Sequence, residues 1–315
     1  MNLKYLIFII ILITGITLAE ETKQKAVLVT GASSGIGLKV TEYLIKSGFY
    51  VYAGARKEED LKRLDAMKNT TSVRLDVTVQ SDIDAAVKFV QSQNRGLFGI
   101  VNNAGVGVFG KMSEVPDKDI LWIHDVNVMG PHRVNRAFIP LLKESMGRTT
   151  IIGSISGYVT SAESGAYSMS KFAVEAYTES LADDLRETGI HVGIVDPGAY
   201  KSKIRAKVTM FNLTGSYDLN QELTEEQKKV LNAAKERNNK LKEPDEVAEA
   251  VIHLMTSDKP KLRYMVAPTI GAAEVTMKTT LGRVVQLNAD QQFEYTRDEL
   301  VAFLDELLKE NSSEL

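Results

Sequence analysis

The sequence contains no cysteine, and this absence removes disulfide frameworks and cysteine-based zinc sites from consideration. Its four histidines, at positions 124, 132, 191 and 253, do not show the spacing of metal ligands. We interpret them as ordinary surface or core histidines. We therefore predict that the protein has no metal site.

The sequence also lacks an excess of positive charge. Lysine and arginine together number 38, against 41 aspartate and glutamate residues, which gives a net charge of −3. Such a balance leaves no basic footprint for nucleic acid, so we predict no nucleic-acid partner. A hydrophobic content of 44% and a charged content of 25% are ordinary for a globular protein. The length of 315 residues favours one domain with terminal extensions over two domains.

The only long uncharged apolar run lies at the N-terminus, from Tyr5 to Ala19, after Lys4. It is longer than a typical signal-peptide core and shorter than the roughly 20 residues of a bilayer span. The small residues around Ala19 form an acceptable cleavage site. Residues 1–19 are thus predicted to be a signal peptide or an N-terminal membrane anchor, with membrane association through residues 5–19 or entry into the secretory pathway.

Short apolar runs alternate with amphipathic stretches through the rest of the chain. The predicted strands are 26–30, 49–53, 72–75, 98–102, 149–154, 190–195 and 262–266. The predicted helices are 36–47, 58–67, 81–93, 117–145, 168–187 and 244–257. This alternation predicts an α/β fold, a Rossmann-like doubly wound parallel sheet with helices on both faces, in a single domain. Residues 199–242 are too long for a simple connection and are predicted to form a lid or binding loop.

A glycine-rich turn follows the first predicted strand. Its residues are Thr30-Gly31-Ala32-Ser33-Ser34-Gly35-Ile36-Gly37, and an amphipathic stretch to Ser47 comes next. A strand, a glycine turn and a helix N-terminus together form a site for a pyrophosphate, because unpaired N–H groups and the helix dipole face the anion. The glycine spacing differs from the usual G-x-G-x-x-G pattern.

Tyr167 and Lys171 lie four residues apart in a stretch that is predicted to be helical. This spacing puts the phenol and the ammonium group on one face, one turn apart. A neighbouring positive charge favours the phenolate, so we expect Lys171 to lower the pKa of Tyr167. A phenol tuned in this way exchanges protons near neutral pH. The pair alone would be unremarkable on a solvated surface, and its significance comes from the glycine turn upstream.

The order of these motifs resembles the short-chain dehydrogenases/reductases. The matching segments are the glycine turn at 30–37, Asn102-Asn103-Ala104-Gly105, Asn127, Ser154, Tyr167-x-x-x-Lys171 and Asp196-Pro197-Gly198. The resemblance covers residues 25–270, which we expect to form the catalytic, NAD(P)-binding domain, and residues 271–315 form a C-terminal extension. Within the family, the chain looks most like the branch of 17β-hydroxysteroid and retinol dehydrogenases. That branch suggests a role in lipid or steroid metabolism.

The resemblance implies a catalytic set of four residues, namely Asn127, Ser154, Tyr167 and Lys171. Tyr167 would be the general acid for carbonyl reduction or the base for alcohol oxidation. Ser154 would polarise the substrate oxygen, and Lys171 would bind the nicotinamide ribose. Asn127 would organise a water next to the lysine.

The resemblance also implies the residues that bind the cofactor. They are Gly31, Ser33, Ser34, Gly35, Ile36, Gly37, Arg56, Asp76, Asn102, Ala104, Gly105, Tyr167, Lys171, Pro197, Gly198 and Ser202. Enzymes that select NAD usually carry an acidic residue after the second strand, where this chain has Ala55 followed by Arg56. A guanidinium group can pair with a 2′-phosphate, and the hydroxyl of Ser34 could add to it. NADP is therefore favoured over NAD.

The predicted pocket lining is largely apolar. It consists of Val108, Phe109, Ile155, Tyr158, Ile204, Val208, Met210 and Phe211. This composition predicts a small lipophilic alcohol or ketone, such as a steroid, a retinoid or a fatty derivative. Two alternatives stay open: a catalytically silent NADP-binding regulator, and an epimerase or dehydratase on the same scaffold. The resemblance further implies a homodimer, paired through the fourth and fifth predicted helices. A last helix is expected over residues 298–309, as a solvated or partner-packing element.

Overall fold

The computed structural model describes residues 23–314, and their side chains as far as residue 310. The predicted signal peptide or anchor, residues 1–19, lies outside this part of the chain. Within the described residues, no helix combines the length and the apolar character that crossing a membrane requires.

The core of the fold is a seven-stranded sheet in which every neighbouring pair of strands is parallel. The strands are β1 (Ala26–Val29), β2 (Tyr50–Ala55), β3 (Thr70–Arg74), β4 (Gly99–Asn102), β5 (Arg148–Ile152), β6 (His191–Pro197) and β7 (Arg263–Val266). Their order, β3-β2-β1-β4-β5-β6-β7, reverses direction at β1 and β4. In open α/β sheets, ligands bind at the carboxyl ends of the strands near such a switch point. The predicted fold class and all seven predicted strands are confirmed.

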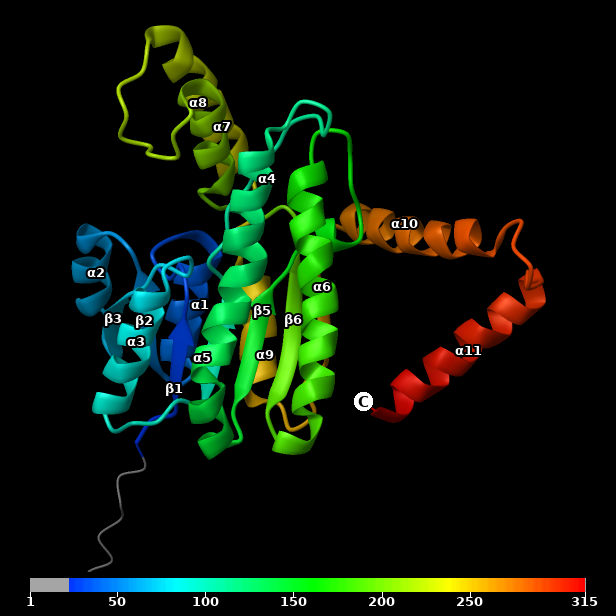
Figure 1. Ribbon diagram of the computed structural model, residues 1–315, viewed down its shortest axis with the longest axis horizontal. Coiled ribbons are helices and arrows are strands. Elements are labelled where there is room, and N and C mark those ends of the chain that lie inside the picture. The colour runs from blue at the N-terminus through cyan, green and yellow to red at the C-terminus, as the bar shows by residue number, and fades with distance from the viewer. Residues whose placement is uncertain (1–22, 315) are drawn as a thin grey trace, which may run out of the picture.

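Helices cover both faces of the sheet (Figure 1). One face carries α1 (Gly35–Lys46), α2 (Glu58–Asp65) and α9 (Asp245–Thr256), and the other carries α3 (Gln80–Ser92), α5 (Gly130–Ser145) and α6 (Gly165–Leu185). The strand β1 shows how one segment serves two cores, because successive side chains point to opposite faces. Val27 and Val29 pack on the α1 and α9 side, whereas Leu28 packs on the α5 and α6 side. All three are fully buried, as expected for a parallel sheet.

The long predicted helix 117–145 is divided into three parts. An α-helix, α4 (Asp117–His124), is followed by one π-helical turn, Asp125–Met129, and then by α5. A π-turn inserts an extra residue into the helical ladder and is frequent at functional sites. The predicted catalytic residue Asn127 lies at the centre of this turn.

Residues 199–242 are not the irregular loop that we predicted. They contain two helices, α7 (Ile204–Thr214) and α8 (Glu225–Asn239), which lie above the carboxyl ends of the strands (Figure 1). Thr224 and Gln227 form a capping box at the start of α8. The two helices share a small core that contains Met210 and Leu231. Their sequence is rich in charged residues and weakly amphipathic, so periodicity did not distinguish it from a loop.

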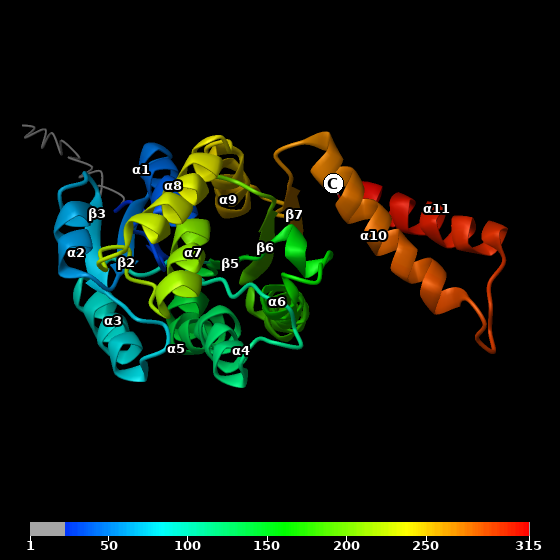
Figure 2. The ribbon, with the colours of Figure 1, turned by 90° about the horizontal axis from the view of Figure 1, so that it is seen from above.

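The chain ends in two helices that project from the body, α10 (Ile270–Asn288) and α11 (Arg297–Glu314) (Figure 2). The helix expected at 298–309 is confirmed and is longer than expected. Helix α10 was not predicted, because its apolar residues are interleaved with threonine and glycine.

Candidate active site

The glycine turn between β1 and α1 is held against the end of β4. The Thr30 hydroxyl accepts hydrogen bonds from the backbone N–H groups of Asn103 and Ala104, at 3.0 and 2.9 Å. The Asn103 amide in turn donates to the carbonyls of Thr30 and Gly31, at 3.0 and 3.1 Å. These bonds fix the turn before any ligand is present. Asn103 and Thr30 have this structural role without having been among the predicted site residues.

Two glycines of the turn have no room for a side chain. A Cβ atom at Gly37 would lie 2.3 Å from the Asn103 amide nitrogen and 2.4 Å from the carbonyl oxygen of Gly31. Gly31 itself has a φ of 65°, which disfavours other residues. The backbone therefore approaches closely around the N-terminus of α1, whose first turn contains no acidic residue. This cradle fits a pyrophosphate, and Ser33, Ser34, Gly35 and Ile36 complete it.

Asn102 differs from the other predicted cofactor residues. Its amide donates to Asn135 at 3.0 Å and to the Thr149 hydroxyl at 3.2 Å, inside the core. The side chain of Asn102 therefore faces the core, and the side chain that holds the glycine turn is that of the next residue, Asn103. The same buried polar network continues from Asn135 in α5 to Tyr177 in α6, and the sequence contains no local signal of it.

Arg56 and Asp76 come together at the ends of β2 and β3. An Arg56 guanidinium nitrogen lies 3.3 Å from an Asp76 carboxylate oxygen. Burial acts to raise the pKa of Asp76, but hydrogen bonds from Thr78 and the charge of Arg56 together lower it. The side chain of Arg56 is 60% exposed, so the guanidinium group is accessible to a ligand.

The buried amide of Asn127 links three elements. It accepts from the backbone N–H of Val106 at 2.8 Å, donates to the carbonyl of Val106 at 3.0 Å, and donates to the Ser170 hydroxyl at 3.0 Å. Gly105 lies against it, since a Cβ atom there would be 3.4 Å from the Asn127 carbonyl oxygen. Asn127 thereby ties the π-turn to the end of β4 and to α6.

Ser154 and Tyr167 face each other beside Lys171. The Ser154 hydroxyl is a neighbour of the Tyr167 phenol and acts to lower its pKa, and the Lys171 ammonium group lies 5.7 Å from the centre of the Tyr167 ring. Lys171 is 7% exposed and donates to the carbonyl of Ile152 at 2.8 Å. The Tyr167 ring stacks on Phe109, with 5.4 Å between ring centres. The structure thus brings the four predicted catalytic residues together at the ends of β4 and β5.

The pKa values of this group differ from the expectation in one respect. Burial raises the pKa of Tyr167, and the Ser154 hydroxyl and the Arg205 charge only partly oppose it. We expected Lys171 to lower the pKa of Tyr167. In this structure it does not, because its ammonium group is directed to the Ile152 carbonyl. Burial also lowers the pKa of Lys171 to about 8, against the opposing charges of Asp196 and Glu175.

A buried pair of carboxyl groups, Glu175 and Asp196, lies behind Ser154. One Asp196 oxygen accepts the backbone N–H of Ser154 at 3.0 Å, and one Glu175 oxygen accepts the Tyr158 hydroxyl at 2.9 Å. Burial and the neighbouring Glu175 raise the pKa of Asp196. Gly153 makes this arrangement feasible, because a Cβ atom there would lie 2.0 Å from an Asp196 oxygen.

This pair was not among the predicted site residues, although Asp196 stood in a quoted motif. The structure also corrects Tyr158, which belongs to this buried network instead of the pocket lining.

The segment after β6 lies between β7 and the glycine turn. Gly198 fits against Pro268, which a Cβ atom at Gly198 would approach to 2.5 Å. Ser202 lies against Gly35, with 3.3 Å between the Ser202 Cβ and a Cβ atom placed on that glycine. The chain therefore runs directly from the carboxyl edge of the sheet to the glycine turn, through Pro197, Gly198 and Ser202.

The lid, which we define as residues 199–242, closes over this edge of the sheet. The Tyr217 hydroxyl donates to the carbonyl of Gly107 at 3.3 Å, and its ring stacks on Trp122 and Phe211, with centres 4.5 and 4.3 Å apart. Val208 is buried beside Gly107. Met210 lies in the lid's own core, so its predicted place in the pocket lining is wrong.

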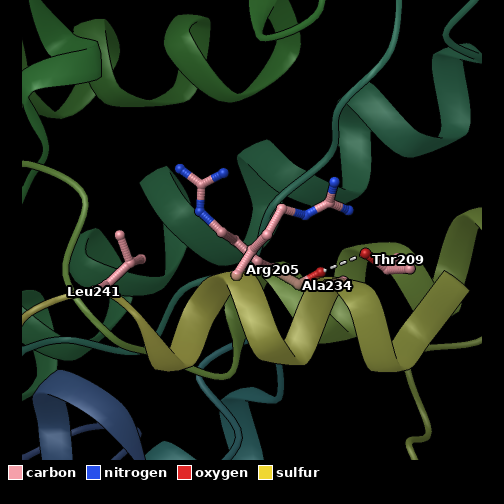
Figure 3. Close-up of a pocket in the computed structure, with 5 residues that line it drawn as sticks. Arg205, Thr209, Ala234 and Leu241 are labelled. Atoms are coloured by element: carbon pink, nitrogen blue, oxygen red, sulfur yellow. Dashed lines mark hydrogen bonds between the residues drawn. The ribbon is translucent and has the colours of Figure 1, made fainter.

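A cavity of about 410 Å³ opens in the lid between α7 and α8 (Figure 3). It is lined by Arg205, Thr209, Ala234, Arg237 and Leu241. The two guanidinium groups drawn in Figure 3 project to the same side of the helices. Among residues 23–310, no carboxylate pairs with either arginine. The cavity therefore presents uncompensated positive charge.

Residues 25–212 match the family model described as short chain dehydrogenase. The chain belongs to the short-chain dehydrogenase family. Over 270 residues this short-chain dehydrogenase is 33% identical to the uncharacterized oxidoreductase YbbO of Escherichia coli, covering 85% of the chain and 95% of that protein.

Two further relatives match a smaller part of this short-chain dehydrogenase. Human retinol dehydrogenase 5 is 37% identical over 184 residues, covering 56% of the chain and 57% of the relative. Bovine mitochondrial D-beta-hydroxybutyrate dehydrogenase is 32% identical over 191 residues, covering 58% of the chain and 56% of the relative. The resemblance to the branch that includes retinol dehydrogenases is confirmed.

Solved structures agree with the fold. A short-chain dehydrogenase from Streptomyces avermitilis superposes with a TM-score of 0.66 at 26% identity, over 92% of this chain and 98% of that chain. One from Burkholderia phymatum, in complex with NAD, gives a TM-score of 0.69 at 22% identity, over 88% of this chain and 99% of that chain. The protein is thus an alcohol-acting oxidoreductase of this family, whose members use NAD or NADP.

Proposed function

We propose that the protein is an NADP(H)-dependent oxidoreductase that interconverts an alcohol and a carbonyl compound. The observation that carries this proposal is the grouping of Ser154 and Tyr167 beside buried Lys171, at the sheet edge that also holds the glycine cradle. The bound nicotinamide would supply or accept the hydride at the substrate carbon.

The chain's own residues would handle the proton. In reduction, Tyr167 gives its phenolic proton to the substrate oxygen as the carbonyl carbon receives the hydride. Ser154 holds the same oxygen by a hydrogen bond, and this bond strengthens as negative charge develops there. Lys171, which the Ile152 carbonyl holds in place, would bind the nicotinamide ribose. Asn127 is a positioning residue, because it holds the π-turn and α6 in register with the end of β4.

Two observations support NADP over NAD. The exposed Arg56 guanidinium lies at the end of β2, where a 2′-phosphate would be bound. Lys207 in the lid is a neighbour of this region, since burial lowers its pKa and the nearby charges of Arg56, Lys203 and Lys57 lower it further. Such a concentration of positive charge favours a ligand with an additional phosphate.

The substrate class that we favour is a lipophilic alcohol or ketone, such as a steroid, a retinoid or a fatty derivative. Phe109 stacks on Tyr167, and Trp122, which packs in the same apolar cluster as Tyr167, stacks with the lid. In the lid, the rings of Tyr217 and Phe211 stack on each other, and Val208 lies beside Gly107. Resemblance to retinol dehydrogenase 5 is in keeping with this choice.

A second candidate is a hydroxy acid or keto acid. The cavity in the lid carries Arg205 and Arg237, and the charge of Arg205 reaches Tyr167 strongly enough to oppose the rise in its pKa. Arginine binds carboxylates bidentately. Resemblance to a hydroxybutyrate dehydrogenase is in keeping with this alternative.

A spectrophotometric screen with NADPH and NADH would test these proposals together. The panel should contain ketosteroids, retinoids, fatty ketones, keto acids and sugars. We expect stoichiometric oxidation of NADPH with a lipophilic ketone or with a keto acid. Brisk activity on sugars alone would contradict both substrate classes. Binding of NADPH without consumption would instead support a silent regulator, and product formation without net consumption would support an epimerase or dehydratase.

We also expect residues 25–270 to be the catalytic domain, residues 271–315 an extension, and residues 1–19 a signal peptide or anchor. Carbonate extraction of membranes from expressing cells, followed by N-terminal sequencing, would distinguish an intact anchor from a cleaved signal. We also propose that two copies of the chain form a homodimer.

A further inference from the structure

The two C-terminal helices form an arm, residues 270–314, that stands away from the catalytic body (Figures 1 and 2). Along α10 only Thr276 is buried, and no α11 side chain is buried among those described. In the part of the chain that the structure describes, neither helix makes an extensive contact with another element.

The arm nevertheless has a defined shape. Thr269 caps the start of α10, and the Asn288 amide bonds the backbone of Tyr295 at 2.8 and 2.9 Å across the turn between the helices. The rings of Tyr295 and Phe303 meet edge to face, 4.9 Å apart. Near the body, the Arg283 guanidinium group lies 4.7 Å from the centre of the Phe172 ring of α6. The turn and the helix starts are therefore specified by side chains, as in an element with a fixed structural role.

Both helices expose a broad apolar face. Residues spaced by three, four or seven positions lie on one side of a helix. On α10 this side contains Ile270, Met277, Leu281 and Val284, which are 45–87% exposed. On α11 it contains Phe303, Leu304 and Leu307, which are 43–60% exposed. Isolated helices of this length are marginal in water and depend on packing of their apolar face.

The area and the charge of the arm indicate what covers it. Each helix is roughly 27 Å long and about 10 Å wide, so the two faces together present on the order of 600 Å². That is comparable to the roughly 800 Å² that each partner buries in a stable protein interface.

The arm carries both signs of charge on different helices. On α11, acidic residues predominate: Asp298, Glu299, Asp305, Glu306, Glu310 and Glu314 stand against Arg297 and Lys309. On α10, the cations Lys278 and Arg283 outnumber Glu274. An acidic helix is disfavoured at an anionic lipid surface, where amphipathic helices are typically rich in lysine and arginine. It is favoured next to the cationic helix of another arm.

We propose that the arm is a dimerisation element, and that α10 and α11 of one copy pack on α11 and α10 of a second copy. A twofold arrangement brings each acidic α11 against a cationic α10 and closes four amphipathic helices around one apolar core. This contact is separate from the pairing through α5 and α6 that the family resemblance implies.

Sedimentation velocity of the full-length chain in a mild nonionic detergent tests the proposal, with two neighbouring substitutions as a matched pair. Leu304→Lys places a charge on the apolar face, and Ala302→Lys places the same charge on the opposite, exposed face without removing an acidic residue. We expect the wild type to associate through the arm, whether or not α5 and α6 also pair, and Leu304→Lys to raise the dissociation constant of the arm contact about tenfold or more. Ala302→Lys should have a much smaller effect. A monomeric wild type, or a dimer that Leu304→Lys leaves unchanged, would overturn the proposal.

A second measurement uses the absence of cysteine. A chain with one introduced cysteine can be crosslinked by a bismaleimide only to another copy. We expect crosslinked dimers for Leu281→Cys and Leu304→Cys, and not for Gln91→Cys on α3. Co-sedimentation with phosphatidylcholine vesicles completes the test. If Leu304→Lys reduced vesicle binding but left the crosslinking of Leu281→Cys unchanged, the arm would be a lipid-binding element and the proposal would be wrong.

Discussion

The carboxyl edge of the sheet and the lid lie against the same glycine turn, but they are held by different kinds of interaction. At the sheet edge, buried polar groups bond to one another, as Asn127 does to Val106 and Lys171 does to Ile152. The lid is held by ring stacking around Tyr217 and by exposed ion pairs such as Lys57 with Asp218.

The difference separates two tasks. Buried hydrogen-bonded groups are costly to rearrange, so the sheet edge is preorganised for chemistry. Stacked rings and solvated charges are cheaper to move, which suits a segment that admits and selects ligands. Substitutions at the edge should therefore act on kcat, and substitutions in the lid should act on KM.

The largest effect is expected from Tyr167→Phe. The substitution keeps the ring that stacks on Phe109 and removes only the proton donor. We expect kcat for carbonyl reduction to fall by roughly 10²- to 10⁴-fold, with the affinity for NADPH unchanged. Tyr217→Phe in the lid is the control, and it should retain most of kcat. Equal rates for wild type and Tyr167→Phe would contradict the proposed mechanism.

Arg56→Gln should alter the choice of cofactor. Loss of a charge-assisted pair with the 2′-phosphate is expected to weaken NADPH binding by about 10- to 100-fold and to leave NADH binding nearly constant. Fluorescence titration of both cofactors would measure this ratio. Arg186→Gln removes another exposed arginine (72%, against 60% for Arg56), far from the glycine turn, and should change neither affinity. Parallel weakening of both cofactors by Arg56→Gln would remove the argument for NADP.

Arg205→Met tests whether the lid binds a carboxylate group of the substrate. If the substrate carries a carboxylate, KM for keto acids should rise about tenfold while kcat changes little. Arg205→Lys, which keeps the charge, should show an intermediate KM. For neutral ketones both variants should match the wild type. A KM for keto acids that does not respond to Arg205→Met would exclude this arginine from substrate binding.

Asp196→Asn tests how much the buried carboxyl pair lowers the free energy of unfolding. Because burial and Glu175 raise the pKa of Asp196, the folded protein holds a proton that the unfolded chain releases above about pH 4. The wild type should therefore lose stability as pH rises from that value towards the raised pKa.

The variant lacks this loss, so its advantage in unfolding free energy should grow by up to about 1.4 kcal/mol for each unit of pH. Urea denaturation at pH 5 and pH 7 would measure it, and the asparagine can still accept the Ser154 N–H. An advantage that is the same at both pH values would show that the pair does not share a proton.

The smallest effect is expected from Asp218→Asn. Both partners of the Lys57–Asp218 pair are more than half exposed, at 57% and 54%, and lie 3.6 Å apart. Solvent screening should limit the loss of stability to less than about 1 kcal/mol. A larger loss, measured by urea denaturation, would show that the lid is held by charge more than by stacking.

The sheet and the candidate catalytic residues could be predicted from the sequence, because both leave local signals. Buried parallel strands appear as β-branched runs, and the spacing of Tyr167 and Lys171 follows from one helical turn. The sequence could not predict which way a side chain points where two neighbouring residues are of the same type. Asn102 and Asn103 are the same residue type, and which one holds the glycine turn depends on where β4 ends and on which side each side chain lies. Asp196 and Glu175 are far apart in the chain, so their pairing depends on tertiary structure.

The number of residues in the π-turn Asp125–Met129 helps to position the candidate active site. A π-turn amounts to one residue more than a regular α-helix requires. Deleting a single residue from this segment would restore regular winding and leave α4 and α5 nearly in register, but it would remove the wide turn that carries Asn127. The helices on either side could keep their places, whereas Asn127 would lose its position between Val106 and Ser170. The segment should therefore tolerate many exchanges of side chain while being intolerant of any change in length.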